Sequence, residues 1–298
     1  MTALDYLCAE DGFLGLSRAD AGPPDEARVV VVPFGLEASV SYGTGTGAGP
    51  RAILNASRQV ELFDEELWCE PFRQGGVATL TPREPTPVIP DALAELSQIT
   101  DRIASEGRFP LVLGGEHSLT PGAVAPLAAR HPELVVVQLD AHADLRDGYD
   151  GEHFSHAAAM RRCLDYPGVT ILSFGVRSLS TEEALFLDAN PRQVRIHWAR
   201  DRHRWRPEAI AAAVAGRPVY LSFDLDALDS GLMPATGTPE PGGLMWDDAL
   251  MVLRAVCESA PVVGADVVEL APRAELPACD FAAARLAYKI IAYTSSRG

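Results

Sequence analysis

Residues 134–144, LVVVQLDAHAD, join a short apolar run to a cluster of polar side chains. The apolar part is rich in valine and shows little polar alternation, which is typical of a strand buried on both faces of a parallel sheet. The run ends in Asp140, His142 and Asp144. Because alternate residues of an extended chain point to the same side, we expect these three side chains to project together.

Two other apolar runs end in the same kind of chemistry. FPLVL at residues 109–113 leads into GGEHS, which contains His117. VYLSF at residues 219–223 leads into Asp224 and Asp226. The carboxyl ends of parallel strands lie along one edge of a sheet, where ligand sites form. We therefore expect the three segments to converge on one site.

The rest of the chain alternates strand-like and helix-like segments. The strand-like runs are residues 28–33, 109–113, 134–139, 169–174, 219–223 and 262–268. The helix-like runs are residues 91–106, 119–130, 181–187, 207–215 and 246–257. This alternation predicts an α/β fold with three α/β/α layers and a central, mostly parallel sheet. Without a repeat or a low-complexity linker, we expect one domain over residues 1–298.

Composition limits the partners that we expect. The chain carries a formal charge of -16, which disfavours nucleic acid and favours cations, including divalent metals and cationic substrates. No apolar run approaches the roughly 18 residues of a membrane helix, and the N-terminal residues do not resemble a signal peptide. The five cysteines form no C-x-x-C pair, which indicates reduced thiols. We therefore predict a cytoplasmic protein without membrane partners.

Electrostatics favours a metal site at the converging strand ends. The candidate ligands are His117, Asp140, His142, Asp144, Asp224 and Asp226. Two carboxylates about 4 Å apart repel by roughly 4 kcal/mol at an effective dielectric constant near 20. The six pairings of four carboxylates total on the order of 15–20 kcal/mol, which rivals the roughly 5–15 kcal/mol stability of a whole domain. Two divalent cations would neutralise this charge, and mixed oxygen and imidazole ligands suit Mn²⁺, Fe²⁺, Co²⁺ or Zn²⁺.

These segments resemble the ureohydrolase (arginase/agmatinase) family. The resemblance lies in GGEHS, LDAHADLR and SFDLDALD, followed by PATGTPEPGG. It extends to SYGTGTGAGPRAILNAS near the start and to GADVVELAP near the end. It implies an arginase-like fold, two Mn²⁺ per subunit, and a homotrimer or homohexamer.

The resemblance also implies how the ligands are divided between two ions. One ion would take His117, Asp140, Asp144 and Asp224, and the other would take Asp140, His142, Asp224 and Asp226. Asp140 and Asp224 would then bridge the pair. A hydroxide held between the ions would attack the guanidinium carbon of the substrate and release urea and an amine.

Two further residues match catalytic positions of the family. His156, in HFSHAAAMRR, matches a proton-shuttling histidine, and an ordinary imidazole pKa near 6.5 suits that task. His153 is the alternative, and His156 could instead merely pack against a helix. Glu269 matches an acid that binds the guanidinium group, for which a carboxylate is the natural bidentate partner. The alternative for Glu269 is an ordinary acid at a strand end.

Other positions near the site carry smaller expectations. Glu116 stands where many relatives have aspartate, and its extra methylene could adjust the surroundings of His117 without removing a ligand. We expect Ser118 to orient the metal ligands. We place the glycine-rich residues 43–47 near the site entrance and residues 236–243 in the pocket wall.

The substrate prediction rests on residues 145–155, LRDGYDGEHFS. Asp147, Asp150 and Glu152 make this loop acidic, which favours an amine over a carboxylate, so we predict hydrolysis of agmatine to putrescine and urea. The alternatives are arginine, formiminoglutamate, and guanidinobutyrate or another guanidino acid bound through Arg146 or Arg177. A non-catalytic binding subunit is a further alternative, which the presence of all six ligand positions argues against.

Overall fold

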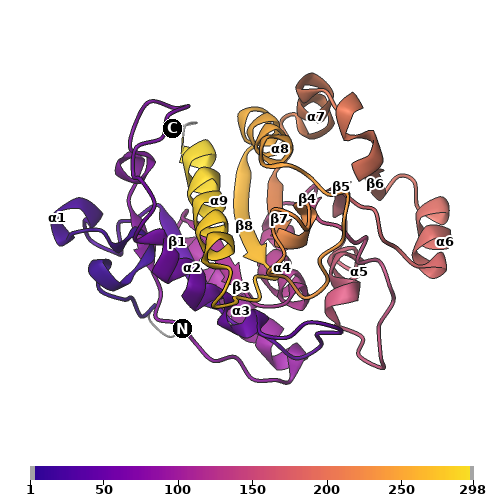
Figure 1. Cartoon of the computed structure of the whole chain (residues 1–298), viewed down its shortest axis with the longest axis horizontal. Helices are drawn as coiled ribbons and strands as arrows, with labels where there is room; N and C mark the ends of the chain where they lie inside the picture. The colour runs from indigo at the N-terminus through magenta and orange to yellow at the C-terminus, as the bar shows by residue number, and fades with distance from the viewer. Residues whose placement is uncertain (1–3, 296–298) are drawn as a thin grey trace.

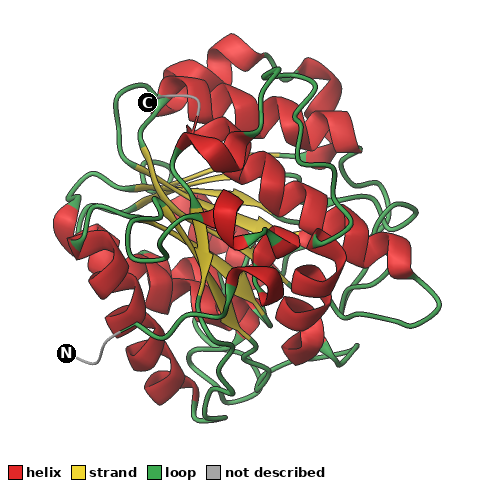
Figure 2. Cartoon of the chain, turned by 90° about the vertical axis from the view of Figure 1, so that its left-hand side faces the viewer, coloured by secondary structure: helices red, strands yellow, loops and turns green. Residues whose placement is uncertain are grey.

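One parallel sheet runs through the chain. The computed structural model describes residues 4–295, and within them eight strands pair in the order β2-β1-β3-β8-β7-β4-β5-β6, every neighbouring pair parallel. The strands are β1 (Val29–Phe34), β2 (Val77–Thr79), β3 (Phe109–Gly114), β4 (Val135–Leu139), β5 (Thr170–Phe174), β6 (Val194–His197), β7 (Val219–Asp224) and β8 (Val262–Val268). Figure 2 shows the sheet in yellow with helices on both sides.

Helices cover both faces of the sheet. They are α1 (Arg18–Ala21), α2 (Gly49–Ser57), α3 (Ile89–Ser105), α4 (Thr120–Arg130), α5 (Ala159–Cys163), α6 (Thr181–Ala189), α7 (Pro207–Val214), α8 (Trp246–Ser259) and α9 (Pro277–Ser295). One face is covered by α3, α4 and α5, and the other by α2, α7, α8 and α9. In Figure 1 the yellow α9 crosses in front of the sheet beside β8. None of the described helices combines the length and the apolar character needed to cross a bilayer.

The three-layer α/β/α prediction is confirmed, and the sheet is wholly parallel within residues 4–295. Each of the six predicted strands is present with both ends within one residue of the prediction. The single domain predicted over residues 1–298 includes residues 1–3 and 296–298, which lie outside the described part.

Strand residues alternate between two apolar cores. Val31, Leu111 and Leu221 belong to the core beneath α9, whereas Val30 and Val112 belong to the core beneath α3 and α4. Because both sets are buried, the strands read as continuous apolar runs.

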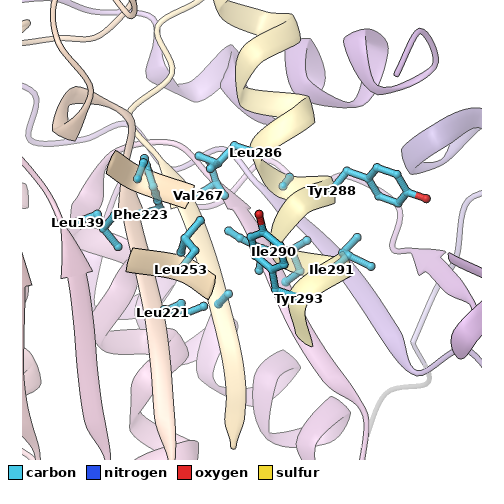
Figure 3. Packing of buried hydrophobic residues seen from close by; sticks show 14 of the residues in the cluster. Leu139, Leu221, Phe223, Leu253, Val267, Leu286, Tyr288, Ile290, Ile291 and Tyr293 are labelled. Atoms are coloured by element: carbon cyan, nitrogen blue, oxygen red, sulfur yellow. The ribbon is translucent and has the colours of Figure 1, made fainter. Parts of the chain in front are cut away.

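The long α9 completes the first of these cores. In Figure 3, Leu286 of α9 lies close to Val267 of β8, and Ile290 belongs to the same apolar cluster as Leu221 and Phe223 of β7; all five side chains are fully buried. Burying one such side chain contributes about 1.5–3 kcal/mol. The resulting stack fixes β7 and β8, and hence the residues that follow them.

Candidate metal centre and active site

Four adjacent strands deliver the candidate site residues to one edge of the sheet. The sheet order places β3, β8, β7 and β4 side by side. His117 follows β3, Glu269 follows β8, Asp224 ends β7, and Asp140 follows β4. Their parallel direction puts all four carboxyl ends together, as expected for an α/β ligand site.

The first cluster of candidate ligands surrounds His117. Its Nδ1 lies 3.1 Å from Asp140 Oδ2, 2.9 Å from Asp144 Oδ2 and 3.3 Å from Asp224 Oδ2. All four side chains are buried. The structure therefore brings together the four residues expected around one ion.

The hydrogen bonds behind His117 leave Nδ1 free to act as a ligand. His117 Nε2 lies 2.8 Å from Ser222 Oγ, and Ser222 Oγ donates to Asp266 Oδ1 at 2.8 Å. A hydroxyl carries one hydrogen, so Ser222 accepts from Nε2–H and the lone pair of the neutral ring is on Nδ1. Nδ1 is buried without a hydrogen-bond partner and faces three carboxylate oxygens. A cation placed among these groups would accept the Nδ1 lone pair and neutralise the carboxylates, so the donor set fits a metal ion.

The second cluster surrounds His142 and shares Asp140 with the first. His142 Nδ1 lies 3.0 Å from Asp226 Oδ2 and 3.6 Å from Asp140 Oδ1. Two groups have ligand atoms close enough to hold a cation: His117 with Asp140 and Asp224, and Asp140 with His142 and Asp226. The structure thus gathers all six predicted ligands, with Asp140 between two candidate cation positions.

Charge is crowded in these clusters, and the pKa values reflect it. Burial, together with the charge of Asp140, raises the pKa of Asp144 to about 7. Burial and the charges of Asp226 and Asp140 raise the pKa of Asp224 well above its usual value. Burial lowers the pKa of His117, but the three aspartates that face its Nδ1 raise the pKa well above the usual value overall. Protons compensate the charge where no metal is bound, and metal binding displaces them.

Backbone turns, rather than an extended chain, aim two of the aspartates. Asp144 has a φ of 52°, in the left-handed region, so the expected alternation from Asp140 to Asp144 is wrong at its last step. Residues Leu225–Ala227 form a 3₁₀ turn in which Asp224 Oδ1 accepts from Asp226 N at 2.8 Å. A strained non-glycine residue costs about 1–3 kcal/mol and is typical of functional sites.

Glu269 closes the site from β8. Its φ is 68°, and its Oε1 accepts from His117 N at 2.6 Å. Its own backbone N–H donates to Gly115 O at 2.8 Å. Burial raises the pKa of Glu269 to about 8. The carboxylate is therefore held rigidly next to the His117 cluster, in surroundings that favour a cationic partner.

A cavity of about 250 Å³ opens onto these residues. Its lining includes His117, His142, Asp144, Asp224, Asp226, Glu269, His156, Arg146, Tyr149 and Glu183. Gly43 and Gly237 also line it, and Gly43 N donates to Gly237 O at 3.0 Å. Both glycine-rich loops therefore lie in the cavity wall, as the sequence predicted.

The structure separates the two candidate histidines. His156 lines the cavity, and its ring nitrogens lie 3.2 Å from Ser39 Oγ and 3.3 Å from Ser41 Oγ. Burial lowers the pKa of His156. His153 is not among the lining residues, and its ring contacts the Arg162 guanidinium. The geometry therefore favours His156 as the residue that faces a substrate.

The acidic residues of loop 145–155 do not face the cavity, so the prediction that they select the substrate is wrong. Asp147 pairs with Arg162 at 2.8 Å, and Asp147, Asp150 and Glu152 are all absent from the cavity lining. The loop contributes Arg146 and Tyr149 instead. The additional carboxylate in the wall comes from Glu183 of α6, which the sequence analysis did not identify.

Two other expectations are corrected. Ser118 Oγ donates to Glu116 Oε1 at 2.5 Å, so it orients Glu116 rather than a metal ligand. Arg177 donates to the carbonyl oxygens of Gly175, Asp226, Ala227, Leu228, Glu240 and Pro241. Its guanidinium is occupied in holding the chain after β7 and cannot bind a substrate carboxylate in this arrangement.

Polar residues inside the strands support the ligands and were missed by the sequence analysis. Gln138 Nε2 donates to Asp140 Oδ2 at 2.7 Å, and Ser173 Oγ donates to Gln138 Oε1 at 2.6 Å. Ser222 and Asp266 support His117 in the same way. The signal was a polar residue within an otherwise apolar strand, since such a side chain must find a buried partner.

Comparison with known proteins agrees with this geometry. Residues 27–293 match the arginase family. The chain is 38% identical over 277 residues to an N(1)-aminopropylagmatine ureohydrolase of Synechocystis, covering 90% of this chain and 89% of that protein. It is 32% identical to an agmatinase of Bacillus cereus, covering 83% and 85%. The crystal structure of agmatine ureohydrolase of Thermoplasma volcanium superposes with a TM-score of 0.84 at 31% identity, covering 95% and 94%. This chain therefore belongs to the arginase family, as a ureohydrolase.

Proposed function

We propose that this ureohydrolase releases urea from agmatine or from agmatine extended by an aminopropyl group. Names of relatives support this substrate class, because the two curated proteins compared above are an aminopropylagmatine ureohydrolase and an agmatinase. The observation that carries the proposal is the cavity in which Glu269, His156 and the two aspartate–histidine clusters face one space.

Two divalent cations, which we propose to be Mn²⁺, would occupy the clusters. His117, Asp140, Asp144 and Asp224 would hold one, and Asp140, His142, Asp224 and Asp226 would hold the other. When bound, such a pair supplies Lewis acidity and lowers the pKa of water, which makes a nucleophile available near neutral pH. The carboxylate-rich ligand set supports Mn²⁺ over softer ions.

Glu269 would bind and orient the guanidinium group. Its Oε1 already accepts from His117 N, which leaves Oε2 for a substrate N–H. A cationic partner favours the ionised carboxylate, whose pKa is raised to about 8 in this structure, chiefly by burial. A planar guanidinium fixed in this way would present its carbon toward the two clusters of candidate ligands.

His156 would move a proton to the departing amine. Collapse of the tetrahedral intermediate breaks the bond from carbon to the alkyl nitrogen, and that nitrogen leaves as a neutral amine only if it gains a proton. The His156 ring lines the cavity. A lowered pKa makes its imidazolium a readier proton donor.

The charge of the cavity supports a substrate with a cationic tail. Glu183 adds a carboxylate beyond the ligand clusters, with its oxygens held by the backbone N–H groups of Leu145 and Ser180. Arg146, the one arginine that residues 4–295 contribute to the lining, favours a second candidate, guanidinobutyrate, because its guanidinium could pair with a carboxylate tail. Glu183 lies 3.9 Å from Arg146 and already offsets part of that charge.

A urea-release assay on the Mn²⁺-loaded protein tests this proposal. The panel is agmatine, N(1)-aminopropylagmatine, guanidinobutyrate and arginine, compared by kcat/KM. We expect one of the two amine-tailed compounds to lead by at least ~10-fold, since opposite tail charges interact very differently with an acidic wall. A lead for guanidinobutyrate that Arg146→Gln abolishes would replace the proposed substrate, and a lead for arginine would refute it.

A further inference from the structure

Glu116 is a buried carboxylate outside the ligand set that holds the rim of the cavity. Ala38 N and Ser39 N donate to its Oε2 at 2.8 and 2.7 Å. Ser39 Oγ and Ser118 Oγ donate to its Oε1 at 2.8 and 2.5 Å. The side chain is fully buried. Residues 38–39 are thus tied to the loop after β3, directly before the segment 40–43 that lines the cavity.

Ser39 connects this carboxylate to His156. Ser39 Oγ lies 3.0 Å from the backbone nitrogen of His156 and 3.2 Å from its Nδ1. The single hydroxyl hydrogen of Ser39 goes to Glu116, so Ser39 offers only lone pairs to His156. A stable contact at Nδ1 therefore requires the ring hydrogen on Nδ1. In the neutral ring the lone pair is then on Nε2.

The other ring nitrogen of His156, Nε2, lies next to a residue that lines the cavity. Ser41 Oγ lies 3.3 Å from His156 Nε2, and both residues line the cavity. The ring of Tyr149 meets the His156 ring edge-on, with centroids 6.1 Å apart, which limits rotation of the imidazole. Two contacts to Ser39 and one to Tyr149 thus define how the ring is presented.

We propose that Glu116, acting through Ser39, is a positioning residue that keeps hydrogen on His156 Nδ1 and thereby makes Nε2 the nitrogen that exchanges the proton. This inference rests on the proposed function, because the proton exchanged is the one given to the departing amine. It assigns a role to Glu116 that differs from adjusting the surroundings of His117. The chain of contacts runs from Glu116 to Ser39 to His156.

A double-mutant cycle tests the chain of contacts in the metal-loaded enzyme. We expect Ser39→Ala to lower kcat by ~10-fold with KM within ~2-fold, because proton transfer is affected and binding is not. Ser39→Thr keeps the hydroxyl and should restore kcat to within ~3-fold. In a His156→Ala background, Ser39→Ala should change kcat by less than ~2-fold, since residues that act through one another are not additive. An equal loss in both backgrounds would overturn the proposal.

Glu37 offers a matched control on the same loop. Its oxygens accept from Gly45 N and Gly47 N at 2.8 Å each, so it anchors the rim without touching His156. If anchoring of the loop were the whole role of Glu116, Glu37→Gln and Glu116→Gln would have the same effect. We expect only Glu116→Gln to couple to His156→Ala in the cycle.

A spectroscopic measurement separates this inference from the proposed function. The protein is labelled with ¹⁵N in its seven histidines and loaded with diamagnetic Zn²⁺, and His156→Ala assigns the resonances. We expect hydrogen on Nδ1 in the wild type and in Glu37→Gln, and a shift toward hydrogen on Nε2 in Ser39→Ala. This result stands even if no urea is released from any substrate. Hydrogen on Nε2 in the wild type, or the same tautomer in Ser39→Ala, would overturn the inference.

Discussion

Ser222 links a candidate metal ligand to the interior of the sheet. Its hydroxyl accepts a hydrogen bond from His117 Nε2–H and donates one to Asp266. Asp266 also accepts hydrogen bonds from Thr120 and Tyr220. Partners of this kind fix the orientation and tautomer of a ligating imidazole. We expect Ser222→Ala to weaken Mn²⁺ binding by ~10–100-fold, measured by competition with a chelator. Unchanged affinity would show that His117 is not a ligand or that its tautomer needs no support.

His156 and His153 form a natural pair for comparison, three residues apart on one loop. His156 faces the cavity, whereas His153 contacts Arg162 outside it. We expect His156→Ala to lower kcat by ~10²–10³-fold, within the range of a lost general acid. His153→Ala should stay within ~3-fold of the wild type. Steady-state urea release measures both, and the opposite ranking would assign proton transfer to His153.

At this scale the sequence located the candidate ligands that the fold gathers, but not the residues that support them. Asp140, His142 and Asp224 were predictable because they directly follow or lie close to the ends of apolar runs, where a buried polar or charged side chain needs a compensating partner. Ser39 was not, because its contact with Glu116 joins residues 77 positions apart through a loop with no period. Glu183 was hidden in the same way, since its place in the wall depends on where α6 begins.

Among the elements, α9 contributes most visibly to the core beneath the site. Leu286 is fully buried and packs close to Val267 of β8, near the strand end that carries Glu269 (Figure 3). We expect Leu286→Ala to lower the free energy of unfolding by about 2–5 kcal/mol, the usual result of a buried cavity. Leu185→Ala on α6 is the control, because Leu185 is 66% exposed and should change stability by less than about 0.5 kcal/mol. Denaturant unfolding of both variants measures the difference.

The degree of burial explains which strands and helices could be predicted from the sequence. The central strands are apolar on both faces, so their runs stand out in the chain. The two strands that were not predicted, β2 and β6, lie at the edges of the sheet and have only three and four residues. The missed α9 is buried along most of its length, so its apolar residues show little of the one-sided period that marks a surface helix.

For the whole molecule, we expect a rise in pH to destabilise the metal-free protein and metal binding to stabilise it. The pKa values of Asp144 and Glu269 are raised to about 7 and about 8, against roughly 4 in an unfolded chain. Between about pH 4 and pH 8 these two carboxyl groups therefore bind more protons in the folded metal-free protein than in the unfolded chain. Their contribution to the stability of the metal-free protein falls as pH rises through this window. The raised pKa of His117 acts in the same direction above about pH 6.5.

Thermal unfolding tests the predicted direction in which stability changes with pH. We expect Tm of the chelator-treated protein to be lower at about pH 8 than at about pH 5.5, because each unit of raised pKa corresponds to about 1.4 kcal/mol. Mn²⁺ displaces the protons, so the gain in Tm on adding Mn²⁺ should be larger at the higher pH. A metal-free Tm that rises across this window would mean that the aspartates are stabilised without a cation.

The central claim is that two cations share the carboxylates at the ends of β4 and β7, together with His117 after β3 and His142 after β4. Anomalous diffraction from a crystal of this protein grown with Mn²⁺ tests it most directly. The account predicts two anomalous peaks, one among His117, Asp140, Asp144 and Asp224 and the other among Asp140, His142, Asp224 and Asp226, with Asp140 and Asp224 touching both. A single peak, or none among these six side chains at saturating Mn²⁺, would contradict it.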